Sequence, residues 1–559
     1  MKLHSRPAVA FAGLVLVAGL AGTTAPAWAA ASSHQARTAA AVPAAGTGHA
    51  VAHVVSVPAA AAGPQIAVHA SSLGTLGRDG KPAGATLPAR ASTGVTSPLA
   101  SPASRAGGPN GGLAARARPS AVPFTPPTTI NANFQGIVQG SSNCGLCQPP
   151  DVNAAVSTTE IAHVVNLRLQ VYNKAGGLLC GVGLNTLAGT SESLSDPRIQ
   201  YNNVYNQFSM VFIPVPASNI APAEYLLTSV TSDACGSWFV YRMTFAGPSF
   251  PAGTLLDYPY LGQDNVPSTV YPTGGAILSS TNNFCCASNG FASYIGSTAF
   301  AIPAYPAYHG LGFSFPAFSV AFSTAPVTVA GIPMFATANT YWLASVPGSG
   351  YDLYVMTHSS QAGTTMALQA AIASAFSAPS RRVIQPGTAQ TLDPLDGRIV
   401  WAPVQDGNFV WFTHGIDLVR GVTHYPSVRY GAIGVATSTA FVALAYHSAT
   451  SDDFNPSIGV SDAGGGLIHA WLNWAYTDTP AGRATSDTLN GVLPGQGVPN
   501  EIGTDLTVVI GSPTASNFRF GDFSSVEVDP SSGGLTAVSA QEYFTSSGLW
   551  TTRIVRSTF

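Results

Sequence analysis

Runs of apolar and β-branched residues follow one another through most of the chain after residue 128. They are rich in Val, Ile, Thr and aromatic residues, and Gly, Asn, Asp or Pro bounds them, which is typical of β-strands. Only Thr365–Phe376 has the alanine content that allows a short helix. The pattern predicts an all-β domain whose clearest strands are Ile161–Tyr172, Phe208–Val215, Trp238–Phe245, Tyr351–Thr357, Phe409–Thr413 and Leu506–Ile510.

A turn motif recurs along this region. In each copy an acidic or amide residue, often beside proline, opens a strand, and a Gly or Asn turn follows. The gap between Asp257 and Asp396 is about twice the others, so we expect a degenerate copy near Pro326–Leu343. The resulting seven units, each of roughly 45 to 70 residues, have the period of β-propeller blades. The clear copies are at Asp151, Asp196, Asp257, Asp396, Asn455 and Asp522.

A four-stranded sheet with two apolar faces cannot stand alone, whereas radial packing into a ring buries both faces. To close the ring, a strand from one terminus of the domain must pair within the blade that the other terminus forms. Ile130–Val138 is well placed to pair beside Leu549–Val555. A two-sheet sandwich is the competing architecture, but it would not repeat its opening motif so often. We therefore expect a single, seven-bladed β-propeller over residues 128–559.

Residues 1–29 have the three parts of a secretory signal peptide. Lys2 and Arg6 give a positive start, Val9–Leu20 is apolar, and Ala27-Trp28-Ala29 is a small-x-small cleavage site. The apolar run is shorter than the about 20 residues of a membrane-spanning helix, which disfavours an uncleaved anchor. We expect an exported protein with no transmembrane segment after cleavage.

Residues 30–127 consist mainly of Ala, Pro, Ser, Gly and Thr, with hardly an aromatic residue. Such a segment cannot bury enough apolar area to offset its ordering entropy, so a disordered linker is predicted. Its basic residues outnumber its single acid, Asp79, but they are scattered rather than clustered. This favours a solvated spacer over a specific binding segment.

The charge of the folded part argues against nucleic acid as a partner. From Thr128 to Phe559 lie 24 of the 25 acidic residues and 13 of the 22 basic residues, a formal net charge of about −11. Such a surface repels phosphate backbones. Charged residues are also sparse, at 8% of the chain, which fits a domain held by apolar burial and backbone ladders. A role in acidic surroundings is a further hypothesis.

Six cysteines lie in the folded part, and an even count in an exported chain favours structural disulfides. The spacing of Cys144 and Cys147 is an alternative signal for metal or redox chemistry. A four-cysteine zinc site, however, needs a second spaced pair, whereas Cys285 and Cys286 are adjacent. The sequence does not fix the connectivity. We favour Cys180 with Cys235, and the Cys144/Cys147 pair with the Cys285/Cys286 pair.

Several stretches carry a resemblance: PPDVNAAVS, HVVNLRLQVYNKAGG, SDPRIQYN, LDYPYLGQD, STNNF, QPGTAQTLDPLDGRI, NPSIGVSDAGG and FRFGDFSSVEVDP. They resemble a family of secreted bacterial β-propeller proteins, usually without an assigned function. The resemblance covers most of the folded part and implies the same fold. The chain departs from the family pattern at Asn202, Gln207, Phe208, Phe520 and Phe523. These changes conserve shape, so the fold inference stands, but a polar site does not carry over intact.

The residues that open the inner strands are the candidate site, because ligands of propellers usually meet a mouth of the central channel. In an architectural interpretation each Asp caps a turn or accepts backbone N–H bonds between blades, and each Arg pairs with an Asp. In a functional one, the side chains converge on a polar ligand. We favour the first, because a side chain that recurs in every blade is rarely unique to a site. The candidates are Asp151, Asp196, Arg198, Asp257, Asp396, Arg398, Arg519 and Asp522.

Catalytic signals are weak. A sialidase-like glycosidase needs three arginines, a Tyr nucleophile activated by a Glu, and an Asp acid. The arginine count is met, and Glu542 and Tyr543 are neighbours, but adjacent strand residues point to opposite faces. The aspartate-box turn is not matched, and serine-hydrolase, zinc-protease and phosphate-loop motifs are absent. His414 and His424 are close in sequence, but we expect surface or turn roles for them.

We therefore expect a secreted or surface-displayed, monomeric binding module, with no resident cofactor or metal. Its partner is expected to be an extracellular polysaccharide or protein. The alternative is a secreted carbohydrate-active enzyme of the sialidase-like kind. A purely structural envelope component is a third possibility, although the chain has neither a wall-sorting tail nor a lipid-attachment cysteine at the cleavage site.

Overall fold

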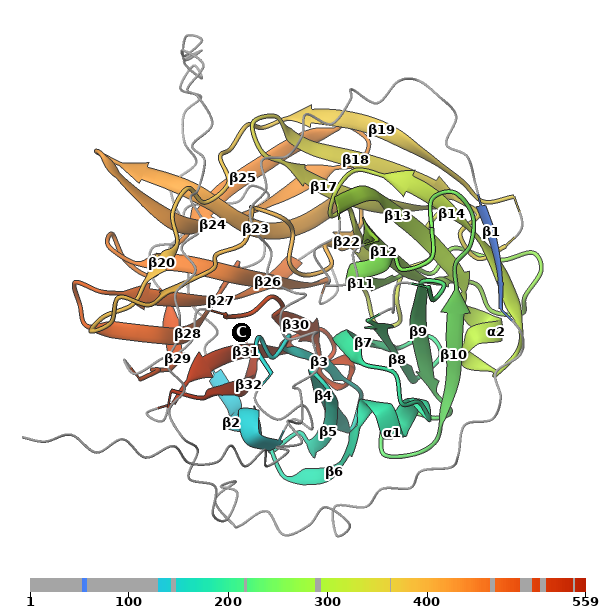
Figure 1. Cartoon of the computed structure of the whole chain (residues 1–559), viewed down its shortest axis with the longest axis horizontal. Helices are drawn as coiled ribbons and strands as arrows, with labels where there is room; N and C mark the ends of the chain where they lie inside the picture. Colours follow the sequence, from blue (N-terminus) through green and yellow to red (C-terminus); the bar gives the residue numbers. More distant parts are fainter. Residues whose placement is uncertain are drawn as a thin grey trace, which may run out of the picture.

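The structure is a computed structural model that describes residues 53–57, 129–141, 147–215, 219–286, 293–361, 363–462, 468–492, 505–512, 519–545 and 548–558. Its sheets are arranged as seven blades around a central axis (Figure 1). The prediction of a single seven-bladed β-propeller is confirmed. The predicted signal peptide and most of the predicted linker lie outside the described residues.

In the first three blades, each strand pairs antiparallel with the next one in sequence, from an inner to an outer strand. Blade 1 contains β3 (Asn153–Val156), β4 (Glu160–Val165), β5 (Arg168–Asn173) and β6 (Leu178–Gly183). Blade 2 contains β7 (Leu194–Asn202), β8 (Gln207–Pro214), β9 (Ala223–Ser229) and β10 (Trp238–Thr244). Blade 3 contains β11 (Leu255–Gln263), β12 (Ala276–Cys285), β13 (Ser293–Pro303) and β14 (Phe313–Val320).

Blade 4 is the degenerate unit expected near Pro326–Leu343. It contains β15 (Ala325–Pro326), β17 (Asn339–Val346), β18 (Gly350–Thr357) and β19 (Thr365–Ala373). Blade 5 contains β22 (Val404–Asp406), β23 (Phe409–Arg420), β24 (Thr423–Gly434) and β25 (Thr439–Ala445), with β16 (Thr328–Val329) added in parallel beside β22. Blade 6 contains β26 (Asp452–Asp462), β27 (Ile468–Asp478), β28 (Arg483–Val492) and β29 (Leu506–Val509).

Blade 7 joins the two ends of the domain. Its strands are β30 (Ser525–Val528), β31 (Thr536–Phe544), β32 (Trp550–Thr558) and, as the outermost, β2 (Thr129–Val138). β2 pairs antiparallel with β32, so that Asn133 lies opposite Val555 and Phe134 opposite Ile554. The predicted closure of the ring by an N-terminal strand is confirmed.

Helices are few among the described residues. α1 (Leu184–Ala188) follows blade 1 and ends at Gly189, whose φ of 64° reverses the chain. α2 (Ala304–Tyr308) lies between β13 and β14, and short 3₁₀ turns occupy Gln139–Ser141 and Pro530–Ser532. The pair β20 (Val383–Ile384) and β21 (Thr391–Leu392) precedes blade 5. No helix in the described part of the chain is long and apolar enough to cross a membrane.

The helix allowed by the alanines of Thr365–Phe376 is not formed. Residues 365–373 are β19, the outer strand of blade 4, and pair with β18 from Thr357 to Gly350. Most of β19 is exposed, with Met366 and Ile372 as its buried residues. Pairing with an existing sheet thus overrides the helix preference of alanine, because β19 gains a continuous ladder of backbone hydrogen bonds with β18 along one of its edges.

One segment of the predicted linker is an exception to the expected lack of structure. His53–Val57 forms β1, which pairs antiparallel with β14 at the outer edge of blade 3. The sequence HVVSV is rich in β-branched residues, which suits it to an exposed sheet edge that has free backbone groups.

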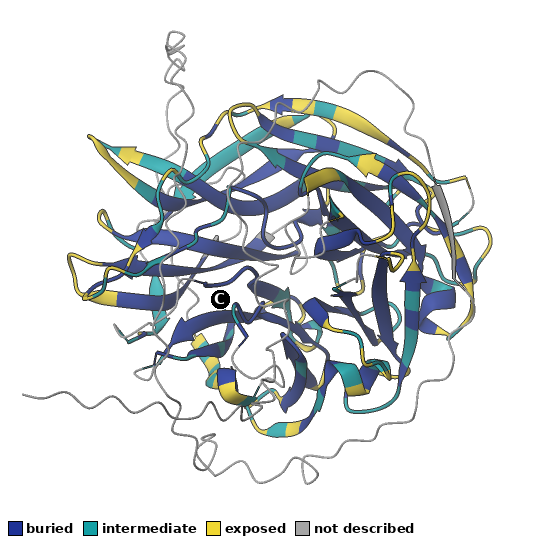
Figure 2. Ribbon diagram, in the orientation of Figure 1, coloured by how far each residue is buried: buried dark blue, intermediate teal, exposed yellow. Residues whose placement is uncertain are grey.

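Burial explains why the inner strands lack a clean alternation of apolar and polar residues. β7 and β11 are buried along their whole length, because both of their faces meet other parts of the ring (Figure 2). Exposed residues concentrate on outer strands and hairpins. Large side chains fill the spaces between blades, among them the fully buried Trp342, Trp474 and Trp550. The ring is thus held by inter-blade apolar contacts rather than by one central core.

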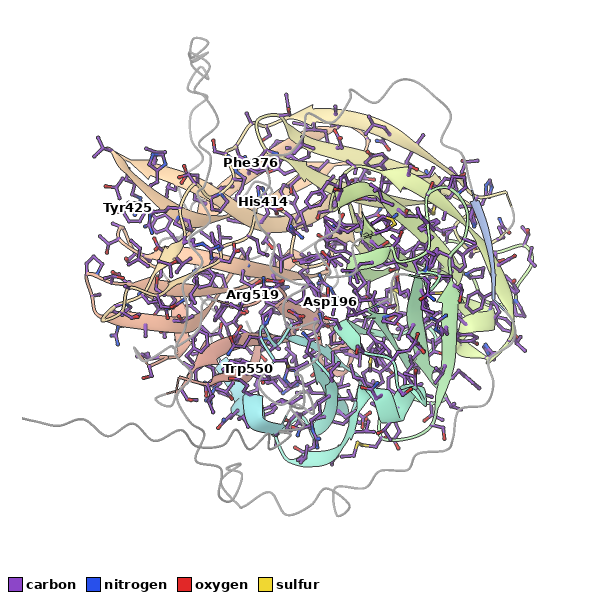
Figure 3. The ribbon with its side chains drawn as sticks, viewed as in Figure 1. Asp196, Phe376, His414, Tyr425, Arg519 and Trp550 are labelled. Atoms are coloured by element: carbon purple, nitrogen blue, oxygen red, sulfur yellow. A yellow bond between two sulfur atoms is a disulfide. The ribbon has the colours of Figure 1, made fainter. Side chains whose placement is uncertain are left out.

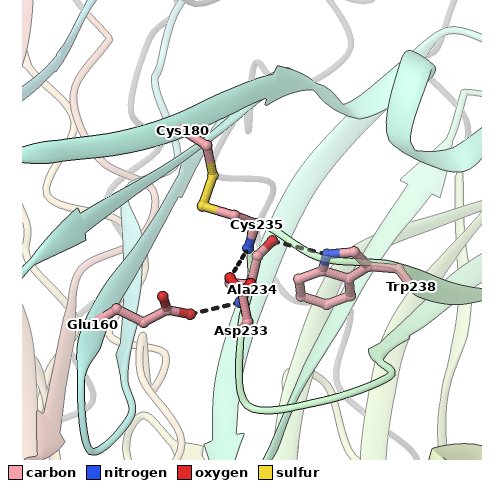
Figure 4. Close-up of a disulfide and its surroundings, with 6 residues drawn as sticks. All are labelled: Glu160, Cys180, Asp233, Ala234, Cys235 and Trp238. Atoms are coloured by element: carbon pink, nitrogen blue, oxygen red, sulfur yellow. Dashed lines mark hydrogen bonds between the residues drawn. A yellow bond between two sulfur atoms is a disulfide. The ribbon is translucent and has the colours of Figure 1, made fainter. Parts of the chain in front are cut away.

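The predicted disulfide between Cys180 and Cys235 is present and joins blade 1 to the hairpin between β9 and β10, with the two Cα atoms 5.9 Å apart (Figure 4). Glu160 reinforces this junction, because its carboxylate accepts a hydrogen bond from the backbone N–H of Ala234 (2.6 Å). The Trp238 indole donates to the carbonyl of Ala234 (3.0 Å). Blades 1 and 2 are thus tied by the disulfide and by the buried hydrogen bond between Ala234 and Glu160.

The second expected pairing, between the Cys144/Cys147 and Cys285/Cys286 pairs, stays a prediction. Cys285 and Cys286 lie at the end of β12 in blade 3. Cys147 is disulfide-bonded and precedes blade 1, and Cys144 lies outside the described residues.

Replacing both Cys180 and Cys235 by Ala is expected to lower the free energy of unfolding by about 2–4 kcal/mol, because the cross-link restricts a long loop of the unfolded chain. Chemical unfolding at constant pH measures this. A change smaller than about 0.5 kcal/mol would show that the buried hydrogen bonds alone hold the junction.

Candidate functional site

A residue with left-handed backbone lies near the start of each inner strand, and in six blades an Asp or Asn of the repeated motif either is this residue or stands next to it. Asp and Asn adopt this conformation more readily than other non-glycine residues. In blades 2, 3 and 6 the next residue is a proline within a β-bulge, where its missing N–H breaks no ladder bond. The seven residues, one per blade, are Asp151, Asp196, Tyr258, Ser323, Leu395, Asn455 and Gly521, with φ between 51° and 89°.

The predicted aspartates meet at the end of the channel where the inner strands begin, here called the opening end. Figure 3 places Asp196 and Arg519 near the middle of the ring. Asp151 accepts a hydrogen bond from the backbone N–H of Asp522 (3.2 Å), which joins blades 1 and 7. Asp196 accepts one from the backbone N–H of Tyr258 (3.2 Å), which joins blades 2 and 3. These carboxylates are therefore inter-blade connectors.

The three predicted arginines are buried and engaged within the protein. Arg519 pairs with Asp522 at 2.9 Å, and Arg398 with Asp396 at 2.6 Å. Arg198 donates to the carbonyls of Pro259 (2.9 Å) and Val400 (2.7 Å). Its guanidinium also lies 3.5 Å from the ring centroid of Phe523. Arg198 thus connects blades 2, 3, 5 and 7 across the axis of the channel.

Burial raises the pKa of several carboxyls at the opening end. Burial, followed by repulsion from Asp196, raises the pKa of both Asp151 and Asp257 well above its ordinary value. Burial also raises the pKa of Asp196, and that of Asp522 to about 6, although Arg519 lowers the latter. The side chain of Asp396 is 34% exposed and is the member of the set that reaches solvent. The geometry fits the architectural interpretation of this cluster.

A pocket occupies the opposite end of the channel, here called the closing end, where the inner strands finish. It is partly open to solvent, and its cavity volume is about 70 Å³. Its walls come from the ends of β3, β7, β11, β26 and β30 and from the segment that follows β15. The lining residues used below are Gln200, Tyr201, Asn203, Gln263, Ile332, Trp401, Ser461 and Glu527.

Two glutamines in this pocket have fixed orientations. The Gln200 amide nitrogen donates to the carbonyl of Leu261 (3.0 Å) and to the Thr328 hydroxyl (3.1 Å). The Gln263 amide nitrogen donates to the carbonyl of Tyr201 (2.8 Å). In both residues the amide oxygen is buried and accepts no hydrogen bond from the described protein. Each glutamine therefore joins blades 2 and 3 with its nitrogen and keeps its oxygen as an acceptor.

A turn at residues 330–335 forms one wall. Asn203 holds it from both sides, donating to the carbonyl of Gly331 (2.9 Å) and accepting from the N–H of Met334 (2.9 Å). Asn265 donates to the carbonyl of Met334 (2.8 Å). Ile332 is exposed at 38% and lines the pocket. The turn belongs to the chain between blades 4 and 5 but is fixed to blades 2 and 3.

Glu527 is the acidic residue of the pocket wall. Its two carboxylate oxygens accept hydrogen bonds from the backbone N–H groups of Tyr201 (3.0 Å) and Val156 (2.6 Å). Burial raises its pKa to about 8 despite these bonds. Glu527 therefore ties blade 7 to blades 1 and 2.

Sequence reasoning missed the residues of the closing end. It concentrated on the strand openings, which repeat, whereas Gln200, Gln263, Ser461 and Glu527 differ in type. A signal was nevertheless present, because each lies four to six residues after an opening Asp or Asn. Polar side chains at the far end of otherwise apolar inner strands mark the second mouth of a propeller channel.

Among the other sequence candidates, Glu542 lies beside the opening end. Glu542 is buried and accepts from the N–H of Gly521 (2.7 Å), while Tyr543 occupies the other face of β31. His414 is buried and bonded to the Tyr351 hydroxyl (2.9 Å). His424 lies on the exposed part of the same hairpin and pairs with Asp417 (2.6 Å). No cluster of three or more His, Cys, Asp or Glu side chains suited to a metal occurs among the described residues.

No family model matches the chain, and no curated protein does. Solved structures share parts of the fold at low identity. A chain of the S. cerevisiae complex of Dbp5 with Nup159, Gle1, IP6 and ADP is 9% identical, with a TM-score of 0.36, over 78% of this chain and 97% of that chain. An α-L-arabinanase of Penicillium chrysogenum bound to arabinobiose is 11% identical, with a TM-score of 0.33, over 65% and 92%.

An exo-β-1,3-galactanase of Phanerochaete chrysosporium bound to galactose is 10% identical, with a TM-score of 0.22, over 75% of this chain and 96% of that chain. At these values the likenesses assign neither a family nor an activity. The chain is thus characterised by its own geometry: a seven-bladed β-propeller whose channel has one internally paired end and one end with a pocket.

Proposed function

We propose that the protein is an exported, non-catalytic binding module whose ligand is held in the pocket at the closing end of the channel. The observation that carries this proposal is the difference between the two ends. At the opening end the charged side chains pair with one another or with backbone, and most of them are buried. At the closing end, residues of six blades together line a pocket. Export is supported by the signal-peptide pattern and by the disulfide between Cys180 and Cys235.

The described pocket offers no arrangement for glycoside hydrolysis. That chemistry uses two carboxyl groups on either side of the scissile bond, whereas Glu527 is the single acidic residue lining the described pocket. Both oxygens of Glu527 also hold backbone N–H groups. The three arginines that a sialidase-like enzyme would need are buried elsewhere. Binding without turnover is therefore the function that the geometry supports best.

The test is a panel of extracellular polysaccharides and proteins presented to the full chain, scored for retention and for release of reducing ends. We expect retention of a polysaccharide without release. Ile332→Trp adds bulk at the pocket mouth and is expected to weaken retention at least tenfold. Phe335→Trp is the matched control, because Phe335 is exposed on the same turn but does not line the pocket.

Equal retention by the two variants would place the ligand elsewhere on the protein. Release of reducing ends would make the protein an enzyme. Thermal unfolding of both variants controls for a loss of folding.

A further inference from the structure

A fifth strand from outside the propeller domain is added to the outer edge of blade 3. This strand, β1, pairs antiparallel with the first five residues of β14, so that Val57 lies opposite Phe313 and His53 opposite Ala317. Figure 1 shows β1 at the outer rim of the ring, away from the central channel. The edge is therefore a different surface from the pocket at the closing end.

The first part of β14 depends on an added strand for its ladder. β14 pairs with β13 from Ala317 to Val320, and no described pairing joins β13 to Phe313–Pro316. β1 is the strand that pairs with these four residues. Their neighbourhood is packed, because the Phe313 and Phe315 side chains are buried. Backbone groups beside packed protein need hydrogen-bond partners, so this edge favours an extended segment.

β1 occupies only part of the edge. β14 has eight residues, Phe313–Val320, whereas β1 has five. No described strand pairs with the outer edge of Phe318–Val320, where Ser319 is exposed. Tyr294 and Ile295 at the start of β13 are also exposed. A strand of eight residues would add three pairs to the ladder that β1 makes.

A tether keeps β1 at this edge. The 71 residues from 58 to 128 join β1 to β2 of blade 7. A tether of such length holds its end at an effective concentration on the order of millimolar. A strand that forms eight pairs instead of five competes with this tethered segment at concentrations below that level.

The composition of the two strands indicates which segments the edge accepts. Neither β14 (FSFPAFSV) nor β1 (HVVSV) contains Asp, Glu, Lys or Arg. Exposed edges commonly carry such charges, which prevent pairing with a further strand. Three of the five residues of β1 are valine, which suits a pleated sheet. The edge therefore fits an extended, uncharged segment rich in β-branched residues.

We propose that the outer edge of blade 3 is a strand-addition site for such a segment of a partner protein, and that β1 is its tethered competitor. In this mode of recognition the backbone hydrogen bonds supply the affinity, and the side chains of alternate residues supply the specificity. The site goes beyond the proposed function, because it does not use the pocket. Binding of the partner removes β1 from the edge.

The experiment measures binding of a fluorescent peptide, TVTHVVSV, to the full chain by anisotropy. The peptide keeps the sequence of β1 and adds three residues for Phe318–Val320. Val54→Pro with Val55→Pro breaks β1, because one of two neighbouring N–H groups in a strand points to the partner strand. This variant is expected to bind the peptide at least tenfold more tightly than the unchanged chain. Ala60→Pro with Ala61→Pro, outside β1, is the matched control and is expected to bind like the unchanged chain.

Hydrogen exchange locates the peptide. We expect added protection along Phe313–Val320 and none along β25, the outer strand of blade 5. The peptide TVTHPPSV, which lacks two donors, is expected not to bind. The proposal is overturned if no chain binds the first peptide, if both peptides bind equally, or if breaking β1 leaves the affinity unchanged. Concentration-dependent dimers of the Val54→Pro, Val55→Pro variant in gel filtration would overturn the choice of partner, because a second copy would then fill the edge.

Discussion

Deletion of Thr129–Val138 is expected to abolish cooperative folding of the propeller. This segment is β2, which pairs with β32 and supplies the outermost strand of blade 7. Without it the edge of β32 is bare, and the Asn133 side chain no longer donates to the Val508 carbonyl of blade 6. The combined loss of a ladder and its packing is comparable to the total stability of a domain, about 5–15 kcal/mol. Circular dichroism, gel filtration and limited proteolysis measure the outcome.

Removal of ten residues from the linker, residues 100–109, is the control of equal length and is expected to leave the unfolding midpoint unchanged. A synthetic peptide covering Thr129–Ser141, added in trans, is expected to restore part of the folding of the deleted chain. An unchanged midpoint in the chain that lacks β2 would contradict the role of ring closure.

The domain is expected to be several kcal/mol less stable at pH 8.5 than at pH 6. Burial raises the pKa of Glu160 and Asp453 to about 7, and that of Glu224, Asp487 and Glu527 to about 8. In the unfolded chain such carboxyls ionise near pH 4. The folded chain therefore binds more protons between these values, and stability falls as the pH rises through them. Each buried carboxyl lowers stability by on the order of 1.4 kcal/mol per pH unit between its unfolded pKa and its folded pKa, and by nothing further above the folded pKa.

The histidines and the ion-paired carboxyls do not reverse this fall in stability between pH 6 and pH 8.5. Burial lowers the pKa of His163 to about 4 and that of His414 to about 3. Both therefore favour folding at higher pH, but only up to about pH 6.5, above which the unfolded histidines are neutral as well. Glu192 and Asp529, whose pKa is lowered by ion pairs and hydrogen bonds despite burial, act only below about pH 4.

Guanidinium unfolding at the two pH values and constant ionic strength measures this difference. Glu224→Gln isolates one contributor, because Glu224 accepts a single described hydrogen bond, from the Ser279 hydroxyl (2.8 Å), and glutamine keeps that acceptor. The variant is expected to lose less stability between pH 6 and 8.5 than the unchanged protein. Equal or greater stability of the unchanged protein at pH 8.5 would refute the argument.

Local chemistry made the fold predictable from the sequence. A left-handed residue near the start of each inner strand favours Asp or Asn, as at Asp151, Asp196 and Asn455. In three other blades an Asp stands beside that residue, and together these positions leave a visible repeat. β19 was less predictable, because its alanines favour a helix in isolation and only the neighbouring β18 makes it a strand.

The candidate site could be predicted only in part from the sequence. The opening-end residues could be identified because they repeat from blade to blade, and they repeat because they connect neighbouring blades. The pocket residues Gln200, Gln263 and Ser461 come from different blades and share no motif. Their common property, a buried polar atom without a partner, exists only after the ring closes and Gln263 reaches the Tyr201 carbonyl of the neighbouring blade.

The Arg198 side chain lies across the axis of the channel. Its guanidinium donates to carbonyls of blades 3 and 5 and covers Phe523 of blade 7, so it blocks the channel between its two ends. A chain molecule cannot thread through such a ring as it would through an open tube. A polymer that binds at the closing end can insert only its tip and must leave through the same mouth. Its terminal unit would therefore decide binding, and cyclic or end-capped forms of the same polymer would not bind.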